Sequence, residues 1–178
     1  MSKEALKNQY LLLIFIFWLV ISGCQPRSDN GFAIYLLSQD IAATEILNLE
    51  IKALHLESEP VISSSDIISY DKLTHTIELT QEAYMQVQQI FSTPVKVNGI
   101  PFVVCVGTER IYTGAFWTPL SSLSFDGVVI IQPFNKDETT IQISLGYPGS
   151  DMFTGRDPRV DKRILYVLAQ DGKLLENP

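Results

Sequence analysis

The chain is poor in the side chains on which most metal and catalytic sites are built. Its 178 residues include only two cysteines and two histidines. It has no pair of closely spaced cysteines, no His-x-x-x-His pattern and no glycine-rich phosphate loop. The sequence therefore predicts no metal and no cofactor, and it assigns no catalytic residue.

Basic side chains are also scarce. There are 13 lysines and arginines against 20 aspartates and glutamates, which gives a net charge of −7. Nucleic-acid binding depends on lysine and arginine contacts to phosphates, so we expect no nucleic-acid partner. The same acidic balance disfavours an electrostatic attachment to anionic lipid. Any membrane attachment must have another source.

Only one long hydrophobic run occurs, from Tyr10 to Ile21, and its 12 residues are too few for a membrane span, which needs about 20. The run follows Lys3 and Lys7 and precedes two small residues, Ser22 and Gly23. A basic start, an apolar stretch of about 7–15 residues and small residues are typical of a secretion signal. We therefore predict a signal peptide over residues 1–23, with an uncleaved anchor as the alternative.

The stretch Ile21-Ser22-Gly23-Cys24 resembles the bacterial lipobox, which has a branched apolar residue, two small residues and a cysteine. The resemblance implies that Cys24 receives a diacylglyceryl thioether and becomes the first residue of the mature chain. Residues 24–30 would then be a lipidated cysteine and a polar tether. The expected location is the cell membrane, with the protein held by its lipid and facing away from the cytoplasm.

Removal of residues 1–23 would leave 155 residues, a length that suits one domain, predicted over 31–178. The removed part carries two lysines and one glutamate, so the remainder has a net charge of −8. If Cys24 is acylated, Cys105 is the single remaining cysteine and no internal disulfide can form. Cys105 lies in an apolar run, Phe102–Val106, and is predicted to be a small buried hydrophobic residue.

The pattern of apolar residues indicates an α+β fold. Strands are expected at 31–37, 49–56, 74–80, 101–106, 110–117, 127–131 and 140–145. A short helix is expected at 41–47, a helical turn from Ser63 to near Tyr70, and two main helices. One main helix begins after Thr80, and the other runs from Asp157-Pro158 to Gly172. These elements predict a single domain with a largely antiparallel sheet and two main helices packed on it.

One enzymatic hypothesis can be built from His75. Asp71 would orient its ring, and Ser121 or Ser122 would be the nucleophile of a hydrolase triad. No Gly-x-Ser-x-Gly elbow surrounds these serines. The alternative is that His75 is a structural residue at the edge of a strand. An anchored hydrolase that uses His75, Asp71 and a serine is therefore the second functional hypothesis.

Two loops, 117–127 and 146–157, combine aromatic rings with serine, glycine and aspartate. Such loops on a rigid scaffold are typical of binding surfaces. The candidate binding residues are Trp117, Phe125, Asp126, Tyr147, Asp151 and Phe153. The alternative is that the rings only cover the ends of the sheet. Asp126, Asp151, Asp157 and Asp161 could also gather around a hard cation, although their spacing matches no calcium-binding loop.

Three stretches carry a further resemblance. The stretches Asp66–Asp71, Thr76–Thr80 and Tyr112–Ser124 look like a group of exported bacterial proteins of uncharacterised role. The order of elements also distantly resembles the extracytoplasmic head of the SecD export subunit. No functional residue is carried over from either. The expectation is a non-catalytic domain that binds a ligand or a protein partner in the cell envelope.

Overall fold

The computed structural model describes residues 31–92, 95–134 and 138–175. The predicted signal peptide, lipobox and tether lie outside these residues. The described chain forms one sheet with the strand order β2-β1-β5-β6-β7-β8-β4-β3, in which only the β6–β7 pair is parallel. The strands are β1 (Phe32–Leu36), β2 (Ile62–Ser63), β3 (Ile67–Asp71), β4 (Thr76–Leu79), β5 (Ile100–Val106), β6 (Glu109–Trp117), β7 (Phe125–Ile131) and β8 (Thr140–Tyr147).

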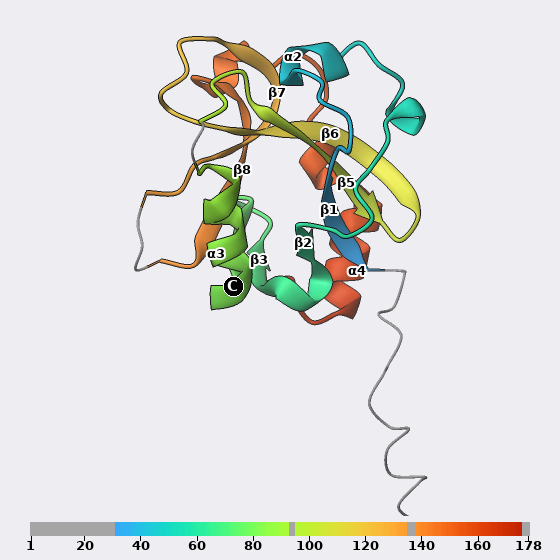
Figure 1. The fold of residues 1–178 in the computed structure, drawn as a ribbon. Coiled ribbons are helices and arrows are strands. Elements are labelled where there is room, and N and C mark those ends of the chain that lie inside the picture. Colours follow the sequence, from blue (N-terminus) through green and yellow to red (C-terminus); the bar gives the residue numbers. More distant parts are fainter. Residues whose placement is uncertain (1–30, 93–94, 135–137, 176–178) are drawn as a thin grey trace, which may run out of the picture.

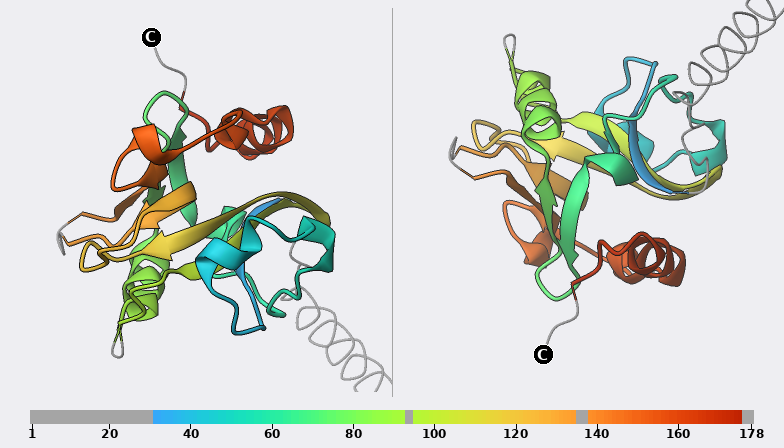
Figure 2. Two further views of the ribbon diagram at one scale, coloured as in Figure 1. Left: turned by 90° about the horizontal axis from the view of Figure 1, so that it is seen from above. Right: turned by 90° about the horizontal axis from the view of Figure 1, so that it is seen from below.

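In the described part of the chain, three α-helices accompany the sheet: α2 (Ala43–Ile46), α3 (Gln81–Ile90) and α4 (Lys162–Gln170). The prediction of a single α+β domain with a largely antiparallel sheet is confirmed. The two longer helices, α3 and α4, lie far apart on the molecule (Figure 2). Both pack their apolar residues into the largest core cluster of the domain.

The two edge strands of the sheet are neighbours in sequence. Strands β2 and β3 are connected by one turn of 3-10 helix, η2 (Ser64–Asp66), so the sheet must curl until its two edges approach each other (Figure 1). Polar contacts fix this connection. The Asp66 carboxylate accepts hydrogen bonds from the Ser63 backbone N–H at 2.8 Å and from the Ser63 hydroxyl at 2.6 Å. The hydroxyl of Ser64 accepts from the N–H of Phe32 in β1 at 2.9 Å.

The curled sheet buries one continuous core between its two halves. The strands contribute alternate apolar residues, which point inward, and the helices α3 and α4 contribute apolar residues to the same core. Phe116 is at its centre, with ring centroids 5.1 Å from Phe102 and 5.9 Å from Phe91. The outer face of β5–β7 is covered by α2 and by the 3-10 helix η1 (Ile51–Ala53), and Cys105 is buried there. Burial raises the pKa of the Cys105 thiol to about 11, as expected of a structural cysteine.

Both main helices begin after a residue whose side chain caps the first turn, but only the cap of α3 was predicted from the sequence. The Thr80 hydroxyl accepts a hydrogen bond from the Ala83 N–H, as predicted for α3. The prediction for α4 placed its start too early. Asp157 caps only a 3-10 turn, η4 (Pro158–Val160), and Asp161 then caps the α-helix itself by accepting from the Arg163 N–H. Gly172 follows the helix with a φ of +66°, a conformation that favours glycine.

Two predicted elements are wrong. The expected strand at 49–56 is instead η1, with an isolated bridge at Leu56. Here the Arg110 guanidinium donates to the carbonyls of Ile51 and Leu54, both at 2.7 Å, and so replaces the partners that a neighbouring strand would supply. The helical turn expected from Ser63 to near Tyr70 ends at Asp66. Strand β3 follows it because Ile67 and Tyr70 point into the core and β4 provides a partner.

The connection between the sheet edges gives a prediction. Replacing Asp66 with alanine removes the acceptor for both Ser63 groups, and we expect it to lower the free energy of unfolding by about 1 kcal/mol, as for other lost caps. The measurement is urea denaturation followed by tryptophan fluorescence. Asp66→Asn keeps an acceptor oxygen and is the matched control. Equal stability of Asp66→Ala and the wild type would show that the turn does not hold the edges together.

Candidate functional site

The six candidate binding residues do not share one environment. Trp117 and Phe125 are 0% and 1% exposed, and their rings stack with centroids 5.0 Å apart. They belong to the core under the outer face, so they cannot form part of a surface. Tyr147 is half-buried, with its ring 5.7 Å from that of Trp117. Its hydroxyl donates to the carbonyls of Pro119 and Ser121, both at 3.3 Å, and so connects the two predicted loops.

A second contact brings the same two loops together. The Asp126 carboxylate accepts hydrogen bonds from the Thr154 N–H at 2.6 Å and from the Thr154 hydroxyl at 2.8 Å. Phe153, next to Thr154, is half-buried and packs against the main core. Asp151 lies in the exposed turn η3 (Ser150–Met152). The two loops named from the sequence therefore meet in the structure, but only some of the six candidate residues reach the surface.

Asp126 and Phe153 line a groove of about 360 Å³. The groove lies where β6 and β7 diverge, because these parallel strands pair only from Gly114 and Val128 onward. The segment around α2 and η1 forms one wall, and the chain at 153–158 forms another. The apolar lining includes Leu47, Leu49, Ile51, Ile111, Phe153 and Pro158.

The only charged side chain among the described residues that line the groove is acidic. Asp126 is its single ionisable carboxylate, and no lysine, arginine or histidine is among its lining residues. No ion pair of Asp126 is found among the residues that the structure describes. The two bonds from Thr154 therefore orient a carboxylate that keeps further acceptor capacity at an apolar surface.

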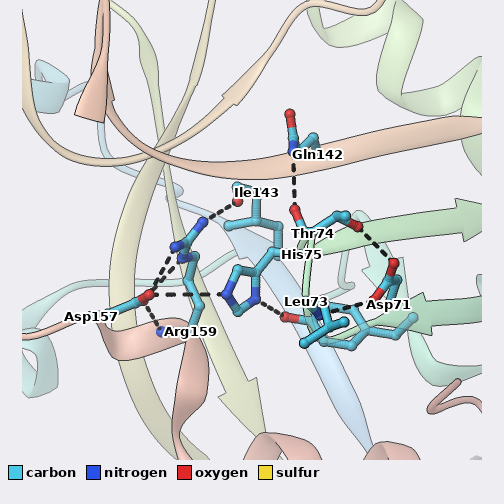
Figure 3. Close-up of polar contacts among 9 residues, drawn as sticks. Asp71, Leu73, Thr74, His75, Gln142, Ile143, Asp157 and Arg159 are labelled. Carbon is cyan, nitrogen blue, oxygen red and sulfur yellow. Dashed lines mark hydrogen bonds and ion pairs between the residues drawn. The ribbon is translucent and has the colours of Figure 1, made fainter. Parts of the chain in front are cut away.

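The chain at 157–159, beside the groove, is held by a buried polar network around His75 (Figure 3). The His75 ring is almost fully buried. Its Nδ1 shares a hydrogen bond of 2.8 Å with the Tyr70 hydroxyl, and its Nε2 is 3.9 Å from Asp157. Arg159 donates from Nε and from a terminal nitrogen to the two oxygens of Asp157, at 2.9 and 2.8 Å, and donates to the Ile143 carbonyl at 2.7 Å.

This network differs from the predicted triad. The Asp71 carboxylate accepts from the Leu73 N–H and the Thr74 hydroxyl, so it closes its own turn and points away from the His75 ring (Figure 3). The recorded partners of the ring in the described part of the chain are Tyr70 and Asp157, and no serine is among them. Burial lowers the pKa of His75, and the nearby Arg159 lowers it further. The ring is thus neutral and structural in character at neutral pH.

Three of the four aspartates considered for a cation accept hydrogen bonds from other residues, and the fourth, Asp151, lies in the exposed turn η3. Asp126 accepts from Thr154, Asp157 from Arg159, and Asp161 from Arg163. Hydrogen bonds from the two arginines lower the pKa of Asp157 and bring that of Asp161 to about 2. Within the described ranges, no group of three or more metal-binding side chains occurs.

Comparisons of this chain with protein-family models, with curated proteins and with solved structures find no match. The functional argument therefore depends on the chain's own residues and contacts. Among the residues that the structure describes, no helix is long and apolar enough to cross a membrane.

The groove contains residues that the sequence did not single out. Leu47, Leu49 and Ile111 come from segments that were predicted as ordinary helix and strands. Their sequence pattern gives no sign of a shared surface, because the groove forms only when chain segments about 60 residues apart meet. Leu47 and Leu49 are 42% and 46% exposed in the folded domain, which is the structural sign that marks them.

The His75 network predicts a pH dependence of stability. The pKa of His75 is below its usual 6.5 in the folded chain, so the unfolded chain binds the proton more readily. The contribution of His75 to the free energy of unfolding should therefore be constant above pH 6.5 and should fall as the pH drops below 6.5. His75→Asn should reduce this fall in stability because it removes the titrating ring. Asparagine is chosen because it tolerates the left-handed φ of +53° at this position.

Urea denaturation between pH 5 and 7.5 measures the effect. This range lies above the pH at which Asp157 titrates, because hydrogen bonds from Arg159 lower the pKa of that carboxyl below 3.8. His55→Asn, at an exposed position, is the matched control. A His75→Asn variant with the same loss of stability below pH 6.5 as the wild type would assign the effect to another group.

Proposed function

We propose that this chain is a lipid-anchored protein of the cell envelope whose domain binds a partner or ligand without catalysis. The groove between the diverging ends of β6 and β7 is its binding site. The observation that carries the proposal is this groove of about 360 Å³, whose lining combines exposed leucines with a carboxylate that has no cationic partner among the described residues. An exposed apolar hollow with one oriented polar group is typical of recognition sites.

The N-terminal features support an attachment close to the membrane. The resemblance of residues 21–24 to a lipobox favours acylation of Cys24. The domain begins at Gly31, whose carbonyl accepts a hydrogen bond from Gly107 at 2.9 Å. The seven residues 24–30 span at most about 25 Å when extended. A domain on such a tether stays near the bilayer and meets partners that share the envelope.

Hydrolysis is less well supported than binding. His75 is almost fully buried, its ring bonds to Tyr70, and it is not among the described residues that line the groove. A general base must reach the proton that it removes. The contacts of His75 instead favour a role in holding residues 157–159 beside the groove.

Attachment is tested at Cys24. We expect the wild-type chain in the membrane fraction to begin at Cys24 and to carry the added mass of a diacylglyceryl group and its acyl chains. Cys24→Ser should stay unmodified and keep its signal peptide, because serine offers no thiol for the thioether. Mass spectrometry of the intact protein and of its N-terminal peptide measures both. An unmodified Cys24, or a mature N-terminus elsewhere, would contradict the proposal.

Binding in the groove is tested with two leucines of similar character. Leu49 lines the groove, whereas Leu120 is 72% exposed on the loop that follows β6 and is not among the lining residues. We expect Leu49→Ser to reduce the recovery of envelope partners cross-linked to the protein, and Leu120→Ser to leave it unchanged. Both variants should keep the wild-type melting temperature, since both side chains are exposed. Equal recovery with both variants would place the binding surface elsewhere.

A further inference from the structure

We propose further that the ligand of the groove is an extended, apolar peptide segment of another envelope protein, with a lysine or arginine that pairs with Asp126. This inference rests on the proposed function and names the chemistry of its ligand. Three features of the groove carry it: the backbone at its floor, the leucines on its wall and the charge at its edge.

The lining of the groove includes part of β6, and the N-terminal half of this strand has no strand partner on its β7 side in the described part of the chain. Strand β6 spans Glu109–Trp117 and pairs with β5 along its length, but its pairing with β7 begins only at Gly114. No pairing of Glu109–Thr113 with β7 is recorded among the described strands. The β7 end has its own irregularity, a shift in register between Phe125 and Val128. An extended peptide can form main-chain hydrogen bonds with such a divergent strand end.

The walls of the groove suit apolar side chains. Leu47 and Leu49 keep about half of their surface exposed in the free chain, and Phe153, which is partly exposed, also lines the groove. Covering such surface removes apolar area from water, which favours binding. Successive side chains of an extended peptide point to opposite sides, so alternate residues would enter the hollow.

The charge of the groove selects the polar part of the ligand. Asp126 is held by both bonds from Thr154, its carboxylate is exposed, and the lining offers it no cation. The net charge of −7 for the whole chain adds to the preference for a cationic partner over an anionic one. A lysine or arginine side chain has both the charge and an apolar stem that can lie along the leucines.

The test uses the mature, lipidated protein in detergent micelles and a random twelve-residue peptide library displayed on phage. We expect enrichment of peptides that combine alternating apolar residues with one lysine or arginine. The most enriched peptide is then synthesised with a fluorescent label, together with a version in which glutamate replaces the basic residue. Fluorescence anisotropy measures the affinity of both for the wild type and for the variants.

Four variants separate the outcomes. Asp126→Asn keeps an acceptor for Thr154 and should weaken the basic peptide about fivefold, the size expected for one exposed ion pair. The matched control Asp151→Asn removes the same charge from an exposed turn outside the groove and should change nothing. Asp126→Lys should favour the glutamate peptide over the basic one. Leu49→Ser should weaken both peptides.

Enriched peptides without a basic residue, or equal binding by Asp126→Asn and the wild type, would overturn the proposal. A library that yields no enriched peptide would also overturn it, as would displacement of a fluorescent fatty acid from the groove in a Leu49-dependent manner. If cross-linked envelope partners still depend on Leu49 in these cases, the proposed function stands and only the ligand class fails. Loss of that dependence as well overturns both.

Discussion

The three-residue turn between β2 and β3 is the constraint on which the rest of the domain depends. It joins β2 and β3, the two edge strands of an eight-stranded sheet. A flat sheet is therefore impossible for this connectivity. The contacts of Ser63 and Asp66 and the bond from Phe32 to Ser64 fix the turn against β1. The resulting curl creates an inner face that is filled by aliphatic and aromatic residues, and α3 and α4 pack against this core at separate positions (Figure 2).

The groove follows from the same arrangement. One parallel pair, β6–β7, is set among antiparallel neighbours, and its strands diverge toward their N-terminal ends. The outer wall depends on Arg110, which holds η1, and the opposite wall depends on Asp157 and Arg159 beside the buried His75. Buried polar groups of this kind stabilise a fold only when each finds a partner. Their satisfied contacts keep both walls in place, while the lining itself remains apolar and exposed.

Much of the fold could be predicted from local pattern, but little of the site could. Thr80 before an apolar stripe identified α3, and the closely spaced strand patterns at 101–106 and 110–117 identified β5 and β6, because both signals lie within one short segment. The prediction of a strand at 49–56 was wrong because the conformation of this segment depends on hydrogen bonds from Arg110, more than 50 residues away. Trp117 and Phe125 looked like binding rings, but α2 covers them from a distant part of the chain. Asp126 and Phe153 were found by composition alone; Leu47, Leu49 and Ile111 needed the tertiary structure.

The central claim is that the groove is the surface through which this chain meets its partner in the envelope. The most direct test places a photoreactive amino acid, p-benzoylphenylalanine, at Leu49 or at Leu120 in the lipidated protein in living cells. The account predicts a discrete cross-linked adduct from Leu49 and none from Leu120, since only the first lines the groove. An adduct from Leu120 alone, or equal adducts from both positions, would contradict it.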